Sequence, residues 1–262
     1  MLTLFTDVDH TLIYSHRSKP NVECIMVETL NGKAQSFITV KTLETLLRLV
    51  ERGKLTIVPV TTRTKEQYER LHRLTERLQI QHAMVCNGAV LLDHGQIDLQ
   101  WITDSRALSK DEMDELYGAY AILKEICGIE RTYFPYEVIA YGVCDNASFA
   151  ADLLKTKVNQ KKCYIGQDRR KVYCIPQSLI KGKAVRRFQK TFFIEKSIAA
   201  GDSEFDISMF YATEYAVFPA GLCDAEMLKN AVTAKKQQLL SDVICDELIR
   251  LTDLDKKKRG WG

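Results

Sequence analysis

The sequence contains no apolar run approaching the roughly 18 residues that a membrane-spanning helix requires. Its first residues, MLTLFTDVDHTL, lack the basic start and the long apolar stretch of a signal peptide. The formal net charge of +3 is too small to indicate nucleic-acid binding by itself. We therefore expect a cytoplasmic protein with no membrane partner and no nucleic-acid partner.

The eight cysteines form no CxxC pair, and the five histidines are dispersed along the chain. This scatter argues against a zinc site built from histidine and cysteine. Several cysteines lie in apolar runs such as AMVCNG and VYCIP, so we interpret them as buried free thiols in a reducing compartment. With 262 residues, 46% of them hydrophobic and 27% charged, the chain is long enough for one large globular domain or two modest ones.

Short apolar runs alternate with helical periodicity in the first third of the chain. Residues 2–6 predict a buried strand that ends at Asp7, and Asn31-Gly32 between two alternating runs predicts a β-hairpin. Four further elements follow in order: a helix at 43–50, a strand at 55–60, a helix at 64–78 and a strand at 83–86. Strands and helices that alternate at this spacing predict parallel βαβ units.

The middle of the chain has a different pattern. Ser109 and Glu112 have the spacing of a capping box, which predicts a helix from there to about residue 126. Residues 132–144 are aromatic and β-branched, which is typical of a strand. After residue 175 the parallel pattern resumes. We therefore predict an α/β fold with a parallel core formed by residues 1–87 and 176–262, and an inserted α+β domain at 88–175.

Two aspartates follow the first predicted strand, in Asp7-Val8-Asp9-His10-Thr11. Open α/β sheets bind ligands beyond the carboxyl ends of their strands. Two carboxylates this close repel each other unless a cation or a proton lies between them. One could then act as a nucleophile and the other as a general acid and base. Taken alone, the segment fits a turn with two solvated aspartates equally well.

Three other segments offer groups that suit phosphoryl chemistry. Residues 201–206 carry Asp202 and Asp206, whose oxygens suit Mg²⁺. Residues 61–64, TTRT, offer hydroxyl and amide groups at a predicted helix start, where phosphate binds well. Lys181 could neutralise charge on a nucleophile. Each segment alone also has a plain structural explanation, either as a helix cap or as a solvated lysine.

Together, and in this order, the four segments resemble the haloacid dehalogenase (HAD) superfamily of phosphohydrolases. The matching pieces are FTDVDHTL (5–12), VPVTTR (58–63), IKGKAV (180–185) and AAGDSEFDISM (199–209). CNGAVLLD (86–93) is similar to the segment that precedes the cap in the Cof-type branch. The resemblance covers nearly the whole chain. It implies a Rossmann-like core with a large α/β cap inserted between the second and third motifs.

The resemblance also implies a role for each matching residue. Asp7 matches the nucleophile, which becomes an aspartyl phosphate, and Asp9 matches the general acid and base. The other matches are Thr61 for the phosphoryl-binding hydroxyl, Lys181 for the charge-neutralising lysine, and Asp202 and Asp206 for acidic ligands of Mg²⁺, with Asp7 and the backbone carbonyl of Asp9 completing the metal site. His10 stands where many relatives have glycine, and we interpret it as a turn residue, with a substrate contact as the alternative. A carboxylate at position 9 favours phosphoryl transfer over dehalogenation, because an oxygen leaving group benefits from protonation.

We therefore predict a phosphatase that acts on a small phosphorylated metabolite, with a sugar phosphate as the favoured class. The predicted substrate contacts are Thr62, Arg63, Asn87, Arg169 and Arg170. The basic run at 169–171 also fits a solvated loop. Two alternatives stay open, namely a phosphomutase of the phosphomannomutase type and a catalytically silent binding protein. Neither the metabolite nor the oligomeric state follows from the sequence.

Overall fold

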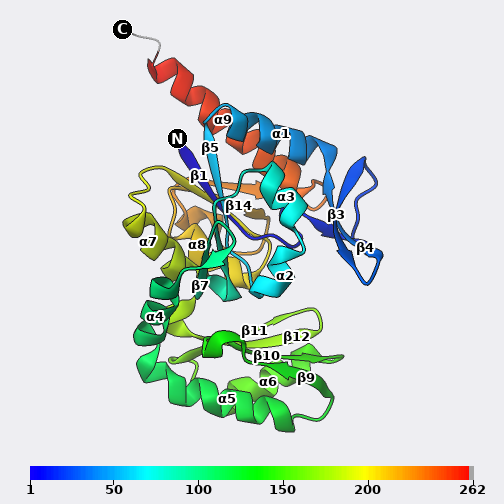
Figure 1. Ribbon diagram of the computed structural model, residues 1–262, viewed down its shortest axis with the longest axis vertical. Helices are drawn as coiled ribbons and strands as arrows, with labels where there is room; N and C mark the ends of the chain where they lie inside the picture. The colour runs from blue at the N-terminus through cyan, green and yellow to red at the C-terminus, as the bar shows by residue number, and fades with distance from the viewer. Residues whose placement is uncertain (260–262) are drawn as a thin grey trace.

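The computed structural model describes residues 1–259, with side chains described up to residue 253 (Figure 1). Its centre is a five-stranded parallel sheet with the strand order β15-β14-β13-β1-β5. The strands are β1 (Leu2–Thr6), β5 (Leu55–Pro59), β13 (Ser197–Ala200), β14 (Tyr215–Pro219) and β15 (Ala231–Ala234). Because all five run parallel, their carboxyl ends meet at one edge. The predicted α/β fold with a parallel core is confirmed.

Helices cover both faces of the central sheet. They are α1 (Val40–Glu51) and α9 (Leu240–Arg259) on one face, and α7 (Lys181–Thr191) and α8 (Ile207–Phe210) on the other. Successive residues of β1 point to opposite faces, so Leu4 joins the apolar cluster that contains Leu43 and Ile244, while Phe5 joins the one that contains Phe188. None of the described helices is long and apolar enough to cross a membrane.

A small antiparallel sheet stands beside the carboxyl end of β1. Its strands are β2 (Tyr14–Ser15), β3 (Cys24–Leu30) and β4 (Lys33–Thr39), in the order β2-β4-β3. Asn31 and Gly32 both have positive φ, at 52° and 73°, as a two-residue turn of the primed type requires. The predicted hairpin is confirmed, and we call this unit the hairpin sheet.

The predicted continuous helix at 64–78 is wrong. The structure has two short helices there, α2 (Lys65–Glu69) and α3 (His72–Arg77). The apolar residues at helical spacing do point inward, but the chain bends at Arg70. The side chain of Arg70 pairs there with the buried carboxylate of Glu28 at 2.8 Å. Periodicity could not show this contact, because Glu28 belongs to β3.

The segment after the central βαβ units forms another small sheet. Its strands β6 (His82–Val85), β7 (Val90–Asp93) and β8 (Gln96–Ile97) are antiparallel, and a bridge between Val60 and Met84 joins β6 to the end of β5. Helix α4 (Leu99–Leu108) follows. The predicted capping box at Ser109 is wrong, because the Ser109 hydroxyl donates to the Ser105 carbonyl at the end of α4. A 3₁₀ turn separates it from α5 (Met113–Glu125).

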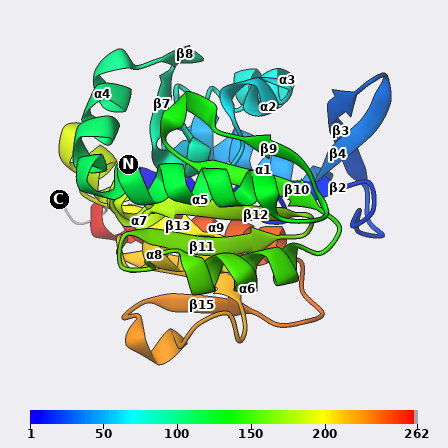
Figure 2. The same cartoon turned by 90° about the horizontal axis from the view of Figure 1, so that it is seen from below.

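The remaining sheet is antiparallel, with the order β11-β12-β10-β9, and we call it the cap sheet. Its strands are β9 (Ile129–Tyr133), β10 (Ala140–Cys144), β11 (Cys163–Asp168) and β12 (Lys171–Pro176), and the strand predicted at 132–144 is interrupted by a turn at Pro135–Glu137. Helices α5 and α6 (Ala147–Lys157) pack on one face, and the other face is turned toward the core (Figures 1 and 2). The division of the chain at residues 88 and 175 stays a prediction.

Candidate active site

Asp7 lies at the carboxyl end of β1, which is flanked by β13 and β5 in the central sheet. Its backbone amide donates to the carbonyl of Ala200 at 2.8 Å, so the strand pairing continues through it. The residue is 8% exposed. The sheet therefore fixes the position of this carboxylate at the edge where open α/β sheets bind ligands.

Lys181 connects the first and last acidic segments. It is the first residue of α7, and its side chain is 1% exposed. Its Nζ donates to Oδ1 of Asp7 and to Oδ1 of Asp206, both at 2.6 Å. Burial acts to lower the pKa of Lys181, but the charges of Asp206 and Asp7 outweigh it and raise the pKa overall. The ammonium group therefore stays charged at neutral pH.

Two glycines permit this close packing. A Cβ atom on Gly182 would lie 2.0 Å from the carbonyl oxygen of Ser208, and one on Gly201 would lie 2.3 Å from the Cβ of Asp206. Any side chain at either position would push these neighbours apart. The glycines beside Lys181 and Asp202 are thus required by the approach of α8 and of Asp206.

Asp7, Asp202 and Asp206 each offer a carboxylate oxygen that lies within 4.8 Å of the other two. Burial raises the pKa of Asp7 well above its usual value, against the attraction of Lys181 and with support from the neighbouring carboxylates. Burial and the charge of Asp206 likewise raise the pKa of Asp202 to about 7. Carboxylates crowded in this way are stabilised in their charged form by a bound cation.

The donor set fits Mg²⁺, which prefers oxygen ligands and takes few carboxylates from the protein. Asp7 and Asp202 could hold such an ion. Both carboxylate oxygens of Asp206 already accept hydrogen bonds from the protein. Oδ2 accepts from the amides of Asp202 and Ser203 and from the Ser203 hydroxyl, and Oδ1 accepts from Lys181. These bonds suit Asp206 to orienting the loop. Its predicted place as a direct ligand stays a prediction.

Asp9 is held by Arg63. The guanidinium donates from Nε to Oδ2 and from Nη2 to Oδ1 of Asp9, both at 2.7 Å. Burial acts to raise the pKa of Asp9, but the hydrogen bonds and the charge of Arg63 lower it overall. In this arrangement Asp9 is a carboxylate with a fixed orientation.

The same guanidinium also binds Glu28, on β3 of the hairpin sheet. Arg63 Nη1 and Nη2 donate to the two Glu28 oxygens at 3.0 Å, and the Ser36 hydroxyl donates to Oε2 at 2.6 Å. The side chain of Glu28 is fully buried. Sequence reasoning missed this residue, and the only signal for it was a single acidic residue within the strand-like run CIMVETL.

Thr61, predicted to bind the phosphoryl group, and Thr62 and Asn87, predicted to contact the substrate, lie in different surroundings. The Thr61 hydroxyl is buried and accepts from the backbone amide of Arg63 at 3.2 Å, whereas Thr62 lines the cavity above Asp7. Asn87 is buried outside that cavity, and its amide group donates to the carbonyl of Leu179 at 3.2 Å. The structure thus brings Thr62 to the site and uses Asn87 to join two chain segments.

The site opens into a cavity of about 510 Å³ between the central sheet, the hairpin sheet and the cap sheet. Arg169 and Arg170 form the turn between β11 and β12 and line this cavity. Arg169 donates to Nδ1 of His10 at 3.2 Å; burial and the Arg169 charge lower the pKa of His10, so its neutral ring can accept. Arg170 pairs with Glu130 and Asp145. The cap sheet therefore touches the core directly beside the two aspartates.

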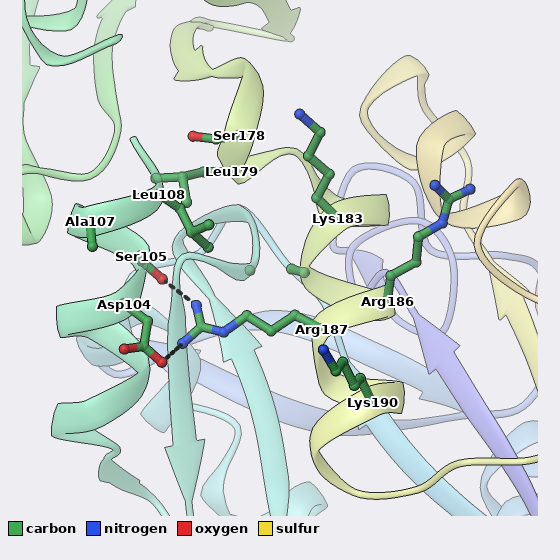
Figure 3. A pocket seen from close by; sticks show the side chains of 12 residues that line it. Asp104, Ser105, Ala107, Leu108, Ser178, Leu179, Lys183, Arg186, Arg187 and Lys190 are labelled. Atoms are coloured by element: carbon green, nitrogen blue, oxygen red, sulfur yellow. Dashed lines mark hydrogen bonds and ion pairs between the residues drawn. The ribbon is translucent and has the colours of Figure 1, made fainter. Parts of the chain in front are cut away.

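A larger cavity, of about 730 Å³, lies between α4 and α7 (Figure 3). Arg187 crosses it, donating to the Ser105 hydroxyl at 3.0 Å and to Asp104 at 3.1 Å, and its guanidinium lies 3.7 Å from the centre of a Trp101 ring. These contacts tie α7 to α4. The cavity contains none of the three clustered aspartates, so we place the candidate site in the smaller one.

No family model matches the sequence, and no curated protein matches it. Solved structures do match its fold. A HAD subclass IIB sugar phosphatase has a TM-score of 0.65 and 15% identity, with 96% of this chain and 99% of that chain covered. The sucrose-phosphatase from Synechocystis, solved with sucrose and phosphate, has a TM-score of 0.57 and 17% identity, with 96% and 98% covered.

The trehalose-6-phosphate phosphatase of Aspergillus fumigatus is similar as well, with a TM-score of 0.53, 11% identity, and 96% of this chain and 92% of that chain covered. These likenesses extend over nearly the full length of both chains. The chain therefore has the fold of the HAD phosphatases, and the resemblance predicted from the four motifs is confirmed at the level of the fold.

Proposed function

We propose that this chain is a Mg²⁺-dependent phosphatase that hydrolyses a small phosphorylated metabolite through an aspartyl phosphate on Asp7. The observation that carries the proposal is the bridge from Lys181 to Asp7 and Asp206, beside Asp202, at the carboxyl edge of the sheet. A sugar phosphate is the favoured substrate class, supported by three similar structures that are themselves named as sugar-related phosphatases.

In the first step, a carboxylate oxygen of Asp7 attacks phosphorus and the bond from phosphorus to the leaving oxygen breaks. Lys181 offsets the charge repulsion between the carboxylate and the phosphoryl group. Mg²⁺, when bound, supplies further positive charge at the same place. Asp9 gives a proton to the departing alkoxide. The negative charge of the phosphoryl group favours protonation of Asp9 beforehand, against the effect of Arg63.

In the second step, water attacks phosphorus and the bond to Asp7 breaks. Asp9, again a carboxylate, takes the proton from this water. Inorganic phosphate leaves and Asp7 is restored. Arg63 positions Asp9 for both transfers, and Glu28 in turn holds Arg63.

We also propose that residues 88–175 act as a cap that closes over the site and excludes bulk water. The contact between Arg169 and His10 supports this role. We place the protein in a reducing compartment, the cytoplasm, in keeping with its eight free cysteines.

Removal of divalent metal is expected to abolish turnover. Released phosphate would be measured with a panel of sugar phosphates in Mg²⁺, then in excess chelator, then after Mg²⁺ is restored. Activity should vanish in chelator and return with Mg²⁺, because Asp7 and Asp202 lose the cation that stabilises their charged forms. Full turnover in chelator would contradict the metal proposal, and release of no phosphate from any compound would contradict the phosphatase proposal.

Arg63→Gln is expected to lower kcat by about 10- to 100-fold with little change in KM, because Asp9 loses the bidentate hydrogen bond that orients it. Steady-state kinetics with the best substrate of the panel would measure kcat and KM separately. Arg77→Gln, in the last turn of α3, is the matched control. A raised KM with unchanged kcat would instead support the direct substrate contact that the sequence predicted for Arg63.

A further inference from the structure

We propose that the substrate carries a second anionic group, besides the phosphoryl group transferred to Asp7, and that Arg131 and Lys171 of the cap sheet bind it. The inference rests on the proposed function and specifies its substrate class. It concerns the side of the cavity formed by the cap sheet, where none of the four sequence motifs lies.

A cationic row crosses the cap sheet on the side facing the core. Arg131 of β9 lies opposite Val143 of β10, and Val143 lies opposite Lys171 of β12. Opposed residues of antiparallel strands share a face, and all three side chains line the cavity. Two strand spacings separate the Arg131 and Lys171 backbones, roughly 10 Å. An anionic group seated over Val143 would therefore lie between two cations.

An aromatic row runs beside the cationic one. Tyr133, Tyr141 and Tyr173 are opposed in the same way, each two residues away from the cationic row on its own strand. The Tyr133 and Tyr141 rings stack with centres 4.7 Å apart and both line the cavity. Flat aromatic faces suit the apolar side of a sugar ring or a carbon chain. The two rows together fit a carbon skeleton that has an anionic group at one end.

The charges around the cavity are not balanced by the protein. Its lining includes eight basic side chains, Arg17, Arg63, Arg70, Arg131, Arg169, Arg170, Lys171 and Lys181, and five acidic ones, Asp7, Asp9, Glu28, Asp168 and Asp202. Ion pairs engage four of the basic groups: Arg63, Arg70, Arg170 and Lys181. Within the described part of the chain the other four form no ion pair, and Arg169 bonds only to the neutral ring of His10.

Lys171 is partly buried and has no ion-pair partner among the residues that the structure describes. It is half-buried over the Tyr141 ring, with its Nζ 5.5 Å from the ring centre, and Asp9 and Asp168 act on it only at longer range. A cation partly removed from water needs a counter-charge or strong hydrogen bonds. A neutral leaving group supplies no counter-charge, whereas a carboxylate or a phosphate supplies one and accepts charge-assisted hydrogen bonds from Arg131 and Lys171 together.

Matched substrates test the proposal. Glucose 1-phosphate, glucuronic acid 1-phosphate and glucose 1,6-bisphosphate differ only at C6, which is uncharged, a carboxylate or a second phosphate. Glycerol 3-phosphate and 3-phosphoglycerate form a shorter pair. With the full-length chain and Mg²⁺, an anionic member of at least one set is expected to exceed its uncharged partner in kcat/KM by about tenfold or more. The first set also separates carboxylate from phosphate recognition.

Variants assign that preference to the cationic row. Arg131→Gln and Lys171→Gln are each expected to reduce the ratio between anionic and uncharged partners toward one. Lys124→Gln is the matched control, since Lys124 lies on α5, over the Tyr120 ring and outside the cavity. Its ratio should equal that of the parent protein.

p-Nitrophenyl phosphate, which has no second anion, reports the phosphatase activity separately. If it is hydrolysed but no anionic member exceeds its uncharged partner in any set, the second anion site is overturned and the proposed function stands. The same holds if the preference survives in both Arg131→Gln and Lys171→Gln. If no compound releases phosphate, both proposals are overturned.

Discussion

Asp7→Asn is expected to lower turnover by about 10⁴-fold or more, without lowering the melting temperature. The loss of activity follows because an amide cannot form the acyl phosphate. The stability follows from the electrostatics of the site. Burial and the carboxylates nearby raise the pKa of Asp7, so holding its charged form in the folded protein costs stability in the absence of metal. A neutral asparagine relieves that cost and can still accept from Lys181.

The measurement pairs phosphate release in Mg²⁺ with thermal unfolding in chelator. Asp206→Asn is the contrasting variant, because the Asp206 carboxylate accepts four hydrogen bonds and its charge pairs with buried Lys181. We expect that variant to melt at a lower temperature than the parent. Substantial turnover by Asp7→Asn at an unchanged melting temperature would mean that another group is the nucleophile.

Asp9→Asn is expected to lower turnover by about 10²–10⁴-fold, the usual contribution of a general acid and base. The two steps should respond differently to leaving-group chemistry. A substrate with a good leaving group needs no proton to depart, so Asp7 should still become phosphorylated. Water attack then lacks its base, so the phosphoenzyme should accumulate. Rapid-quench kinetics with p-nitrophenyl phosphate would show a burst of nitrophenol followed by slow phosphate release.

Asp152→Asn provides the control for this result. Asp152 is an exposed acidic residue on α6, paired only with Lys155 one turn away, and it lies outside the cavity. Its kinetics should match those of the parent protein. An Asp9→Asn variant that turns over normally, or that forms no phosphoenzyme with any substrate, would contradict the two-step role given to Asp9.

The sequence predicted the parts of the site that belong to single segments. Asp7, Lys181 and Asp202 follow strand ends or helix starts, and the order of strands in a parallel sheet brings those ends to one edge. The fold class and the hairpin turn followed from equally local signals, namely apolar runs of strand length and an Asn-Gly pair between alternating segments.

The contacts between distant segments could not be predicted in this way. Glu28 of the hairpin sheet meets Arg63, 35 positions later in the chain, and it also pairs with Arg70, where the chain bends between α2 and α3. The cationic and aromatic rows could be recognised only from the strand register of the cap sheet. A one-residue slip in that register would move the side chains of a strand to the opposite face. Arg131 and Lys171 are 40 positions apart, and only that register places them on either side of Val143.

The most direct test of the central claim is to locate the phosphoryl group on the enzyme. Asp9→Asn would be mixed with p-nitrophenyl phosphate and Mg²⁺, quenched in acid, reduced with borohydride to convert an acyl phosphate into homoserine, and digested for peptide mass spectrometry. The account predicts homoserine at position 7 in the peptide that contains FTDV, and none when Asp7 is also replaced by asparagine. Modification at another residue, or none while nitrophenol is released in a burst, would contradict it.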